Sequence, residues 1–161
     1  MTNIYTTCME SPVGRIVLIS DETQLKSVNF SEEPVDEPTV LPDILLRTKE
    51  QLNEYFSGVR MQFDLELAPV GTVFQQSVWQ RLLLIPYGAT KSYRDIALEL
   101  GSVLATRAVG PANGKNPIPI IIPCHRIIGS DGKLVGYAGG LERKRWLLLH
   151  EAKHKKEERL F

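Results

Sequence analysis

Residues 121–128, Ile-Ile-Pro-Cys-His-Arg-Ile-Ile, place a cysteine and two basic side chains between two apolar, β-branched pairs. Such pairs predict buried strand or the wall of a pocket, so we expect the polar triplet inside the fold. The proline fixes one backbone angle just before the sulfur. Nearby positive charge favours the thiolate, the reactive form of cysteine. The pattern alone leaves two interpretations open, a nucleophile or a small buried side chain.

The size and composition of the chain predict one or two compact domains, with 161 residues and 43% hydrophobic side chains. With only 2 cysteines, Cys8 and Cys124, no disulfide framework is indicated. We find no secretory signal pattern, and no apolar stretch approaches the ~18 residues of a membrane span. We therefore expect a cytoplasmic protein that does not associate with membranes.

The formal net charge of +0 hides an uneven distribution along the chain. Residues 1–66 hold five Lys and Arg against twelve Asp and Glu, whereas the rest of the chain holds fourteen against seven. This distribution predicts that the second part faces a polyanion and that the first part does not. A second interpretation stays open, in which opposite charges help two lobes to dock.

The first part of the chain reads as a small domain over residues 1–67. Short apolar segments separated by turn residues predict antiparallel strands within residues 16–30. Apolar side chains at helical spacing predict a helix over 41–56, and a last short strand is expected over 61–67. We expect this antiparallel-sheet domain to have a structural role.

The second part, residues 71–161, reads as a mostly helical domain. Thr72 and Ser92 are suited to cap two helices, and a third helix is expected to start near Val103 after a glycine-containing turn. A helix, a short turn and a second helix predict a helix-turn-helix. Pro111 removes a backbone donor, so we expect the third helix to be shortened. The fold class is therefore α/β (α+β). A small antiparallel-sheet domain is followed by a mostly helical domain that contains the helix-turn-helix.

The chain after the cysteine continues with a hairpin turn, a loop and a helix. Residues 130–133 have hairpin-turn composition, and residues 134–140 form a glycine-rich loop. A closing helix is expected from about residue 141 to 151.

Several segments of the second half carry a family resemblance. They are residues 71–76, 79, 85–88, 92–93, 107–110, 112–113, 116–118, 123–126, 136–140 and 148–151. In this order they resemble the O6-alkylguanine-DNA alkyltransferases, also called methylated-DNA–protein-cysteine methyltransferases. Because the whole ordered set matches, the resemblance is far more specific than any one motif.

The resemblance implies DNA repair by stoichiometric alkyl transfer. The partner would be double-stranded DNA containing O6-alkylguanine, and O4-alkylthymine is a further possible substrate. The alkyl group would move once to a cysteine of the protein, which is thereby inactivated. No cofactor is implied. The protein is expected to be a monomer in solution, and cooperative binding along DNA stays open.

The same resemblance assigns the catalytic residues. Cys124 would accept the alkyl group, and His125 and Glu151 would form a relay through water that takes the thiol proton. Tyr93 would donate a proton to guanine N3 as the base leaves. The alternatives are a solvated tail carboxylate for Glu151 and ordinary core packing for Tyr93.

Four residues near the third helix are assigned to DNA. The lesion must rotate out of the duplex, and Arg107 would fill the gap as an intercalating finger. Ala105, Ala108 and Gly110 would let this helix approach the minor groove closely. Without the resemblance, Arg107 would be interpreted as an ordinary exposed helix arginine.

Residues around the cysteine are assigned to a guanine pocket. Tyr137, Ala138, Gly139 and the backbone of Ile127 would line it. Two further residues are given structural roles. Asn116 would bond backbone on both sides and tie the DNA-binding helices to the cysteine segment, and Arg126 would anchor a buried ion pair.

We expect no metal site. Some relatives bind zinc near the N-terminus, but residues 1–66 contain only Cys8 and no histidine. His150 and His154 lie four residues apart on the closing helix, and with no third ligand evident a solvated face is the favoured interpretation.

Three rival functions are weighed against alkyl transfer. An alkyltransferase-like protein that only flips damaged bases would replace Cys124, which is present. A helix-turn-helix regulator that senses alkylation would need further domains. In a Cys-His hydrolase, Cys124 and His125 would have to cooperate, but adjacent residues on extended backbone point to opposite faces.

Overall fold

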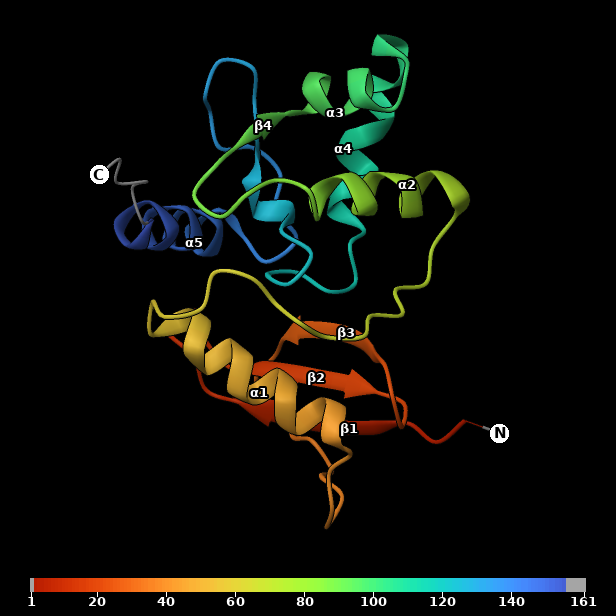
Figure 1. Cartoon of the computed structure of the whole chain (residues 1–161), viewed down its shortest axis with the longest axis vertical. Helices are drawn as coiled ribbons and strands as arrows, with labels where there is room; N and C mark the ends of the chain where they lie inside the picture. Colours follow the sequence, from red (N-terminus) through yellow and green to blue (C-terminus); the bar gives the residue numbers. More distant parts are fainter. Residues whose placement is uncertain (1, 156–161) are drawn as a thin grey trace, which may run out of the picture.

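The computed structural model describes residues 2–155, so the end of the predicted domain 71–161 lies outside the described residues. Figure 1 shows a sheet-containing N-terminal region below a largely helical C-terminal region. One cluster of buried apolar side chains runs through both regions and includes Leu18, Tyr55, Trp79, Ile118 and Leu147. The two regions therefore share a continuous core.

The N-terminal region is a three-stranded antiparallel sheet with a helix packed on it (Figure 1). Its elements are β1 (Tyr5–Met9), β2 (Ile16–Ser20), β3 (Leu25–Phe30) and α1 (Asp43–Phe56). The predicted strands within residues 16–30 and the predicted helix are confirmed. The strand predicted over 61–67 is wrong, because only an isolated bridge between Leu25 and Leu67 forms there.

The C-terminal region is mostly helical, as predicted. Its elements in order are α2 (Val73–Leu82), β4 (Lys91–Ser92), α3 (Tyr93–Glu99), η1 (Val103–Ala105), α4 (Thr106–Gly114), η2 (Cys124–Arg126), β5 (Ile127–Ile128) and α5 (Leu141–His154). The side chains of Thr72 and Ser92 cap α2 and α3, each in a reciprocal capping box. The short strands β4 and β5 pair in parallel and link the helix-turn-helix to the cysteine segment.

The helix-turn-helix consists of α3, the turn at Gly101, η1 and α4. Gly101 has a φ of 94°, which glycine adopts without strain. The prediction that Pro111 shortens the last helix is wrong, because α4 continues to Gly114. Proline deletes the helix bond to the carbonyl of Arg107, and both residues are exposed, so water can replace that bond. Burial of the opposite face of α4 outweighs the lost bond.

The sequence predicted buried strand or the wall of a pocket on both sides of the cysteine, but the backbone at the cysteine itself is not extended. Residues Cys124–Arg126 form a single 3-10 turn, η2, and extended backbone begins only at Ile127. The turn predicted at 130–133 is present, with Gly129 N–H donating to the carbonyl of Lys133. Residues 134–140 form no strand, in agreement with the glycine-rich loop predicted there.

Within residues 2–155, no helix combines the length and the apolar character that crossing a bilayer requires.

Candidate active site

Cys124 follows a strained loop that an asparagine holds in place. The β-branched Ile120 has a φ of 75°, a costly conformation for such a residue. The side-chain oxygen of Asn116 accepts from the Ile118 N–H at 3.0 Å, and its amide nitrogen donates to the Ile122 carbonyl at 2.7 Å. The predicted bonds of Asn116 to backbone on both sides are therefore present. They fix the loop directly before the sulfur.

The thiol of Cys124 is held in its protonated form. The residue is only 5% exposed, and burial raises the pKa of the thiol from 9.0 to about 11. A hydrogen bond from Asn116 and the charge of Lys144 act in the opposite direction but do not prevail. The expectation that neighbouring basic residues favour the thiolate is wrong for this structure, because burial outweighs the charge of Lys144 and the Arg126 guanidinium is paired with Glu151.

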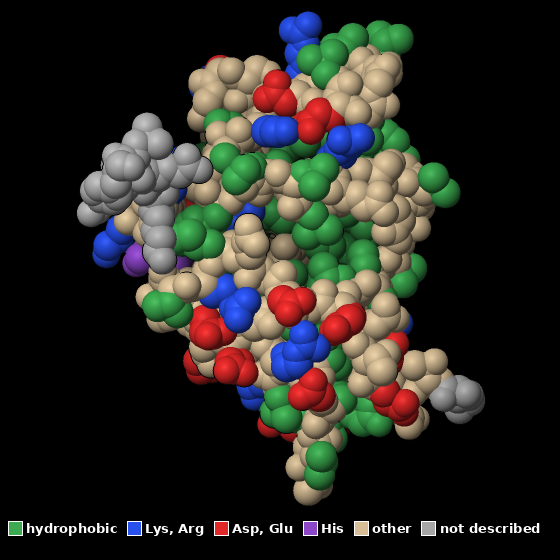
Figure 2. All heavy atoms as spheres, in the orientation of Figure 1, with side chains coloured by type: hydrophobic (Ala, Val, Ile, Leu, Met, Phe, Trp, Pro, Cys, Tyr) green, Lys and Arg blue, Asp and Glu red, His purple; other side chains and the backbone are tan. Residues whose placement is uncertain are grey.

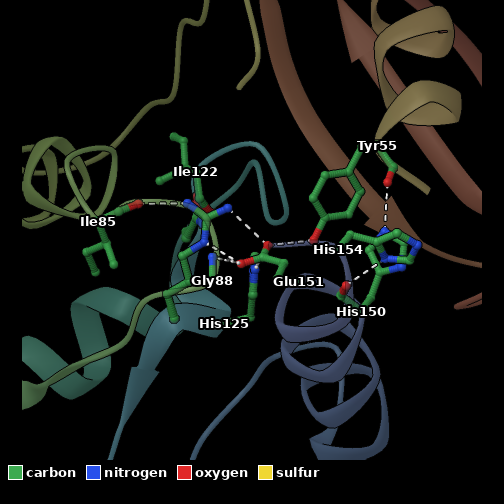
Figure 3. Close-up of polar contacts among 10 residues, drawn as sticks. Tyr55, Ile85, Gly88, Ile122, His125, His150, Glu151 and His154 are labelled. Atoms are coloured by element: carbon green, nitrogen blue, oxygen red, sulfur yellow. Dashed lines mark hydrogen bonds and ion pairs between the residues drawn. The ribbon is translucent and has the colours of Figure 1, made fainter. Parts of the chain in front are cut away.

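Glu151 is the centre of a buried network of donors (Figure 3). Its Oε1 accepts from Arg126 Nε at 2.8 Å and from Gly88 N–H at 3.2 Å. Its Oε2 accepts from Arg126 Nη2 at 3.0 Å, from His125 Nε2 at 2.7 Å and from the Tyr55 hydroxyl at 2.6 Å. Burial alone would raise the pKa of Glu151, but the hydrogen bonds from His125 and Arg126 and the charge of Arg126 hold it well below its usual range. The group is therefore a carboxylate.

The network fixes the tautomer of His125. A carboxylate only accepts hydrogen bonds, so His125 Nε2 must carry the proton that Glu151 receives. Burial lowers the pKa of His125, although Glu151 opposes this, so the ring is neutral. Its Nδ1 is buried and has no hydrogen-bond partner within residues 2–155. His125 therefore presents a free basic nitrogen in a fixed orientation.

Arg126 forms the buried ion pair that the sequence predicted. Besides its two bonds to Glu151, its Nη1 donates to the Ile85 carbonyl at 2.7 Å. This bond ties η2 to the segment after α2. The paired geometry is bidentate, which orients both groups as well as neutralising them.

The loop of residues 134–140 covers the cysteine, and two side chains bond its Val135 carbonyl. The Tyr93 hydroxyl donates to the Val135 carbonyl at 3.1 Å, and Lys144 Nζ donates to the same oxygen at 2.7 Å. Burial, followed by the negative charge of an ionised Cys124, raises the pKa of both Tyr93 and Tyr137. The predicted proton donor and the predicted stacking residue thus lie close to the sulfur.

The remaining predicted pocket residues differ in their exposure. Ile127 is wholly buried in β5, whereas Ala138 is exposed. Gly139 lies against two aromatic rings, because a Cβ there would stand 2.7 Å from Tyr137 and 2.8 Å from Phe30. Only glycine fits at this position without displacing a ring.

The predicted DNA-contacting residues lie on and beside the helix α4. Arg107 and Ala108 are exposed, while Ala105 in η1 and Gly110 are half-buried. The opposite face of α4 is packed through Val109, which is wholly buried. The structure therefore presents Arg107 to solvent from a helix that is well anchored below it.

Residues 2–155 contain no group of three or more His, Cys, Asp or Glu side chains suited to a metal ion. The solvated face expected for His150 and His154 is wrong for His150, which is 7% exposed. One ring nitrogen of His150 bonds the Tyr55 carbonyl at 2.7 Å, and His154 Nδ1 bonds the His150 carbonyl at 2.8 Å (Figure 3). This pair belongs to the packing between α5 and α1.

Three residues near the site were not predicted from the sequence. Tyr55 contacts Glu151, and Lys144 contacts the loop over the cysteine. Asn113 donates to the Cys124 carbonyl at 3.3 Å. Tyr55 lies in an apolar helix pattern, and Lys144 lies in a charged segment, so neither pattern carries a signal. Asn113 falls within a matched motif, which was the one available indication.

The surface carries an acidic end and an apolar groove. Figure 2 shows many Asp and Glu side chains over the N-terminal region, in the lower half of the view, and apolar side chains in a hollow beside its centre. A groove of about 700 Å³ has apolar lining from both regions, including Leu65, Leu83 and Ile121, and Cys124 does not line it. This groove is therefore separate from the thiol.

Family models match both regions of the chain. Residues 4–69 match the model for the 6-O-methylguanine DNA methyltransferase, ribonuclease-like domain, and residues 73–153 match the model for its DNA binding domain. A methylated-DNA–protein-cysteine methyltransferase of Methanosarcina acetivorans is 48% identical over 150 residues, covering 90% of this chain and 96% of that protein. A protein of the same name from Mycobacterium tuberculosis is 46% identical over 149 residues, covering 90% of each.

Solved structures of related proteins resemble this fold over almost the whole chain. The crystal structure of M. tuberculosis O6-methylguanine methyltransferase superposes with a TM-score of 0.86 at 42% identity, covering 97% of each chain. A crystal structure of M. tuberculosis OGT in complex with DNA has a TM-score of 0.83 at 46% identity, covering 91% of this chain and 92% of that chain. With both regions matched and the likeness extending through the fold, this chain belongs to the methylated-DNA–protein-cysteine methyltransferase family.

Proposed function

We propose that this protein repairs DNA by moving the alkyl group of O6-alkylguanine to the sulfur of its own Cys124, once per molecule. Transfer of a methyl group from DNA to a protein cysteine is the activity of its family. In this reaction the bond from guanine O6 to the alkyl carbon breaks and a bond from sulfur to that carbon forms. The thioether product does not revert, so the protein is consumed.

The observation that carries this assignment is the free Nδ1 of His125. A thiol with a pKa of about 11 is a weak nucleophile at neutral pH, so a base must take its proton during attack. His125 is neutral, and Glu151 holds its other nitrogen at 2.7 Å. A water molecule between the sulfur and Nδ1 would complete the relay, and the Glu151 carboxylate stabilises the imidazolium that forms.

Tyr93 supplies the second proton that the reaction needs. As the O6 bond breaks, negative charge develops on the guanine, and a proton delivered to N3 neutralises it. The Tyr93 hydroxyl now donates to the Val135 carbonyl, so this bond must be exchanged for one to the base. His125 takes one proton from the thiol and Tyr93 gives one proton to the guanine, so the number of protons on the protein and base together is unchanged. The reaction requires no cofactor.

The lesion reaches this site as a flipped nucleotide. A stacked guanine cannot present O6 to a buried thiol, so the base must leave the duplex. In our proposal α4 lies in the minor groove and Arg107, which is exposed, occupies the gap. The small residues Ala105, Ala108 and Gly110 allow close approach to the DNA.

Entry of the base requires the covering loop to move. Cys124 is 5% exposed, and the bonds of Tyr93 and Lys144 to Val135 hold the loop over it. After such a movement, Tyr137, Ala138, Gly139 and Ile127 would line the guanine pocket. A closed loop at rest also protects the thiol from other electrophiles.

Several finer expectations stay predictions. They are repair of O4-alkylthymine, the choice of alkyl groups, a monomeric state in solution, a cytoplasmic location and the division of the chain into domains 1–67 and 71–161. The alternative function, in which the protein flips damaged bases without transfer, makes a different prediction about Cys124. In that case the sulfur would not become alkylated.

An intact-mass measurement tests the proposal directly. The protein is mixed with duplex DNA containing O6-methylguanine, and we expect a single gain of about 14 Da on the peptide that holds Cys124. A Cys124→Ala variant should still bind the DNA and gain no mass, whereas Cys8→Ser should react like the wild type. A methyl group found on Cys8, or none on the protein, would reject the assignment.

A further inference from the structure

The N-terminal region places one side chain inside the relay. Tyr55 lies in the last turn of α1, and its hydroxyl donates at 2.6 Å to Oε2 of Glu151, 96 residues further along the chain. The same oxygen accepts from His125 Nε2 at 2.7 Å (Figure 3). Tyr55 is 0% exposed and Glu151 1%, so no solvent screens this contact. With Arg126 Nη2, which donates to this oxygen at 3.0 Å, three donors share one buried oxygen.

Two neighbouring residues of α5 hold both ends of Tyr55. His150 bonds the Tyr55 carbonyl at 2.7 Å while Glu151 receives its hydroxyl. Further aromatic rings surround the phenol, with centroids 5.5 Å away at Phe63 and 6.1 Å away at Tyr87. The hydroxyl accordingly has one orientation open to it, toward the carboxylate.

We infer that Tyr55 is a positioning residue for alkyl transfer, through which the N-terminal region sets the orientation of Glu151 and the basicity of His125. The inference rests on the proposed function, since it concerns the same relay. Each donor on Oε2 withdraws negative charge that would otherwise stabilise the imidazolium. Tyr55 thereby keeps His125 a weaker base that is neutral at physiological pH.

The ionisation state of Tyr55 suits this role. Burial and the neighbouring Glu151 charge raise the pKa of Tyr55 well above its ordinary value, so the phenol stays a donor. Other charged or titratable groups also face the relay. They are Cys124 and Arg126 from η2, Lys144 and His150 from α5, Tyr87 from the segment after α2 and Tyr137 from the loop of residues 134–140. None of these, apart from Arg126, donates to Oε2 among the described contacts.

Removing the hydroxyl should change the pH dependence of transfer. In Tyr55→Phe, Oε2 loses a donor and becomes a stronger partner for protonated His125, so the pKa of His125 rises. We expect the acidic limb of the rate profile with DNA containing O6-methylguanine to move upward by about 0.5 to 1 pH unit, the size of one hydrogen bond. At neutral pH the transfer rate should fall about three- to tenfold, because Glu151 is also held less firmly.

Tyr87→Phe is the matched control. Its hydroxyl is buried and has no partner within residues 2–155, its ring packs beside Tyr55, and phenylalanine keeps that ring. This variant should leave both the rate and the pH profile unchanged. Denaturant unfolding of both variants separates a loss of stability from a change in the relay.

A second substitution keeps the inference testable if Tyr55→Phe does not fold. Incorporating 3-fluorotyrosine at position 55 retains the hydroxyl and makes it a stronger donor, so the acidic limb should move to lower pH. Profiles that coincide with wild type in a folded Tyr55→Phe protein, or in the fluorinated protein, would overturn the inference. Wild-type protein that gains no methyl group would instead reject the proposed function, so the two failures are distinct.

Discussion

The relay around Glu151 and the loop over Cys124 lie next to one another but are built in opposite ways. Glu151 receives donors from four residues of three segments, and its three side-chain partners are buried. The loop of residues 134–140 is largely exposed, and side chains bond only two of its carbonyls among the described contacts: Tyr93 and Lys144 bond that of Val135, and Arg143 bonds that of Gly139. The groups that move protons are thus fixed before substrate arrives, whereas the cover that admits the base is lightly held.

This difference has an energetic basis. A buried carboxylate is tolerated only when its lone pairs are occupied, so the donors around Glu151 stabilise the fold as well as the reaction. An exposed loop loses little when its bonds open, because water replaces them. Substitutions in the relay should therefore affect both stability and transfer, and substitutions in the loop should mainly affect access.

Glu151→Gln should have the greatest consequence for the fold. The amide cannot neutralise Arg126, which is left as a buried unpaired charge, and its NH₂ group faces donors. We expect a loss of about 3–5 kcal/mol in the free energy of unfolding, measured by urea denaturation. Glu50→Gln, on the exposed side of α1, should stay within about 0.5 kcal/mol of wild type.

The same carboxylate should make stability depend on acid pH. Its folded-state pKa lies below the ordinary value of 4.5, so its contribution is present above that value and is lost as pH falls toward the folded pKa. Wild type should therefore lose stability below about pH 4.5, and Glu151→Gln should lose less. If the free energy of unfolding of the two proteins changed with pH in the same way, the buried ion pair between Glu151 and Arg126 would be contradicted.

The thiol of the resting protein should titrate far above neutrality. In a Cys8→Ser background, the reaction of Cys124 with iodoacetamide should rise with a midpoint near pH 11, because burial disfavours the thiolate. Lys144→Met should move the midpoint higher still, since the Lys144 charge lowers the pKa of Cys124. A midpoint below 9 would mean that the loop does not exclude water from the sulfur.

The sequence predicted those features that local patterns encode. Thr72 and Ser92 cap the helices where expected, and the alternation of apolar segments located the sheet. The 3-10 turn at Cys124 was not predicted, because β-branched flanks favour extended backbone unless a distant side chain intervenes. Here Asn116 supplies that side chain by bonding both sides of the preceding loop.

The relay was likewise predicted only in part from the sequence. The resemblance gave His125 and Glu151, and Arg126 was expected in an ion pair, yet the fourth partner, Tyr55, was missed. Its position in α1 satisfies a helix pattern, and only the packing of α1 on α5 shows where its hydroxyl goes. Contacts between residues 96 positions apart leave no periodic trace in a single sequence.

Arg107→Ala tests how the exposed face of the helix α4 serves transfer at Cys124, whose carbonyl is bonded by Asn113 from the opposite face of the same helix. If Arg107 fills the gap left by the flipped base, its loss should slow transfer from duplex DNA about tenfold, because flipping costs a few kcal/mol and one contact recovers part of it. Reaction with free O6-methylguanine requires no flipping and should be unaffected. Arg145→Ala removes the same charge from an exposed site on α5 and separates this role from general attraction to phosphate. Equal slowing on duplex DNA and on the free base would mean that Arg107 is needed for the structure of the site. The distinction between a rigid relay and a helix that opens the DNA would then be wrong.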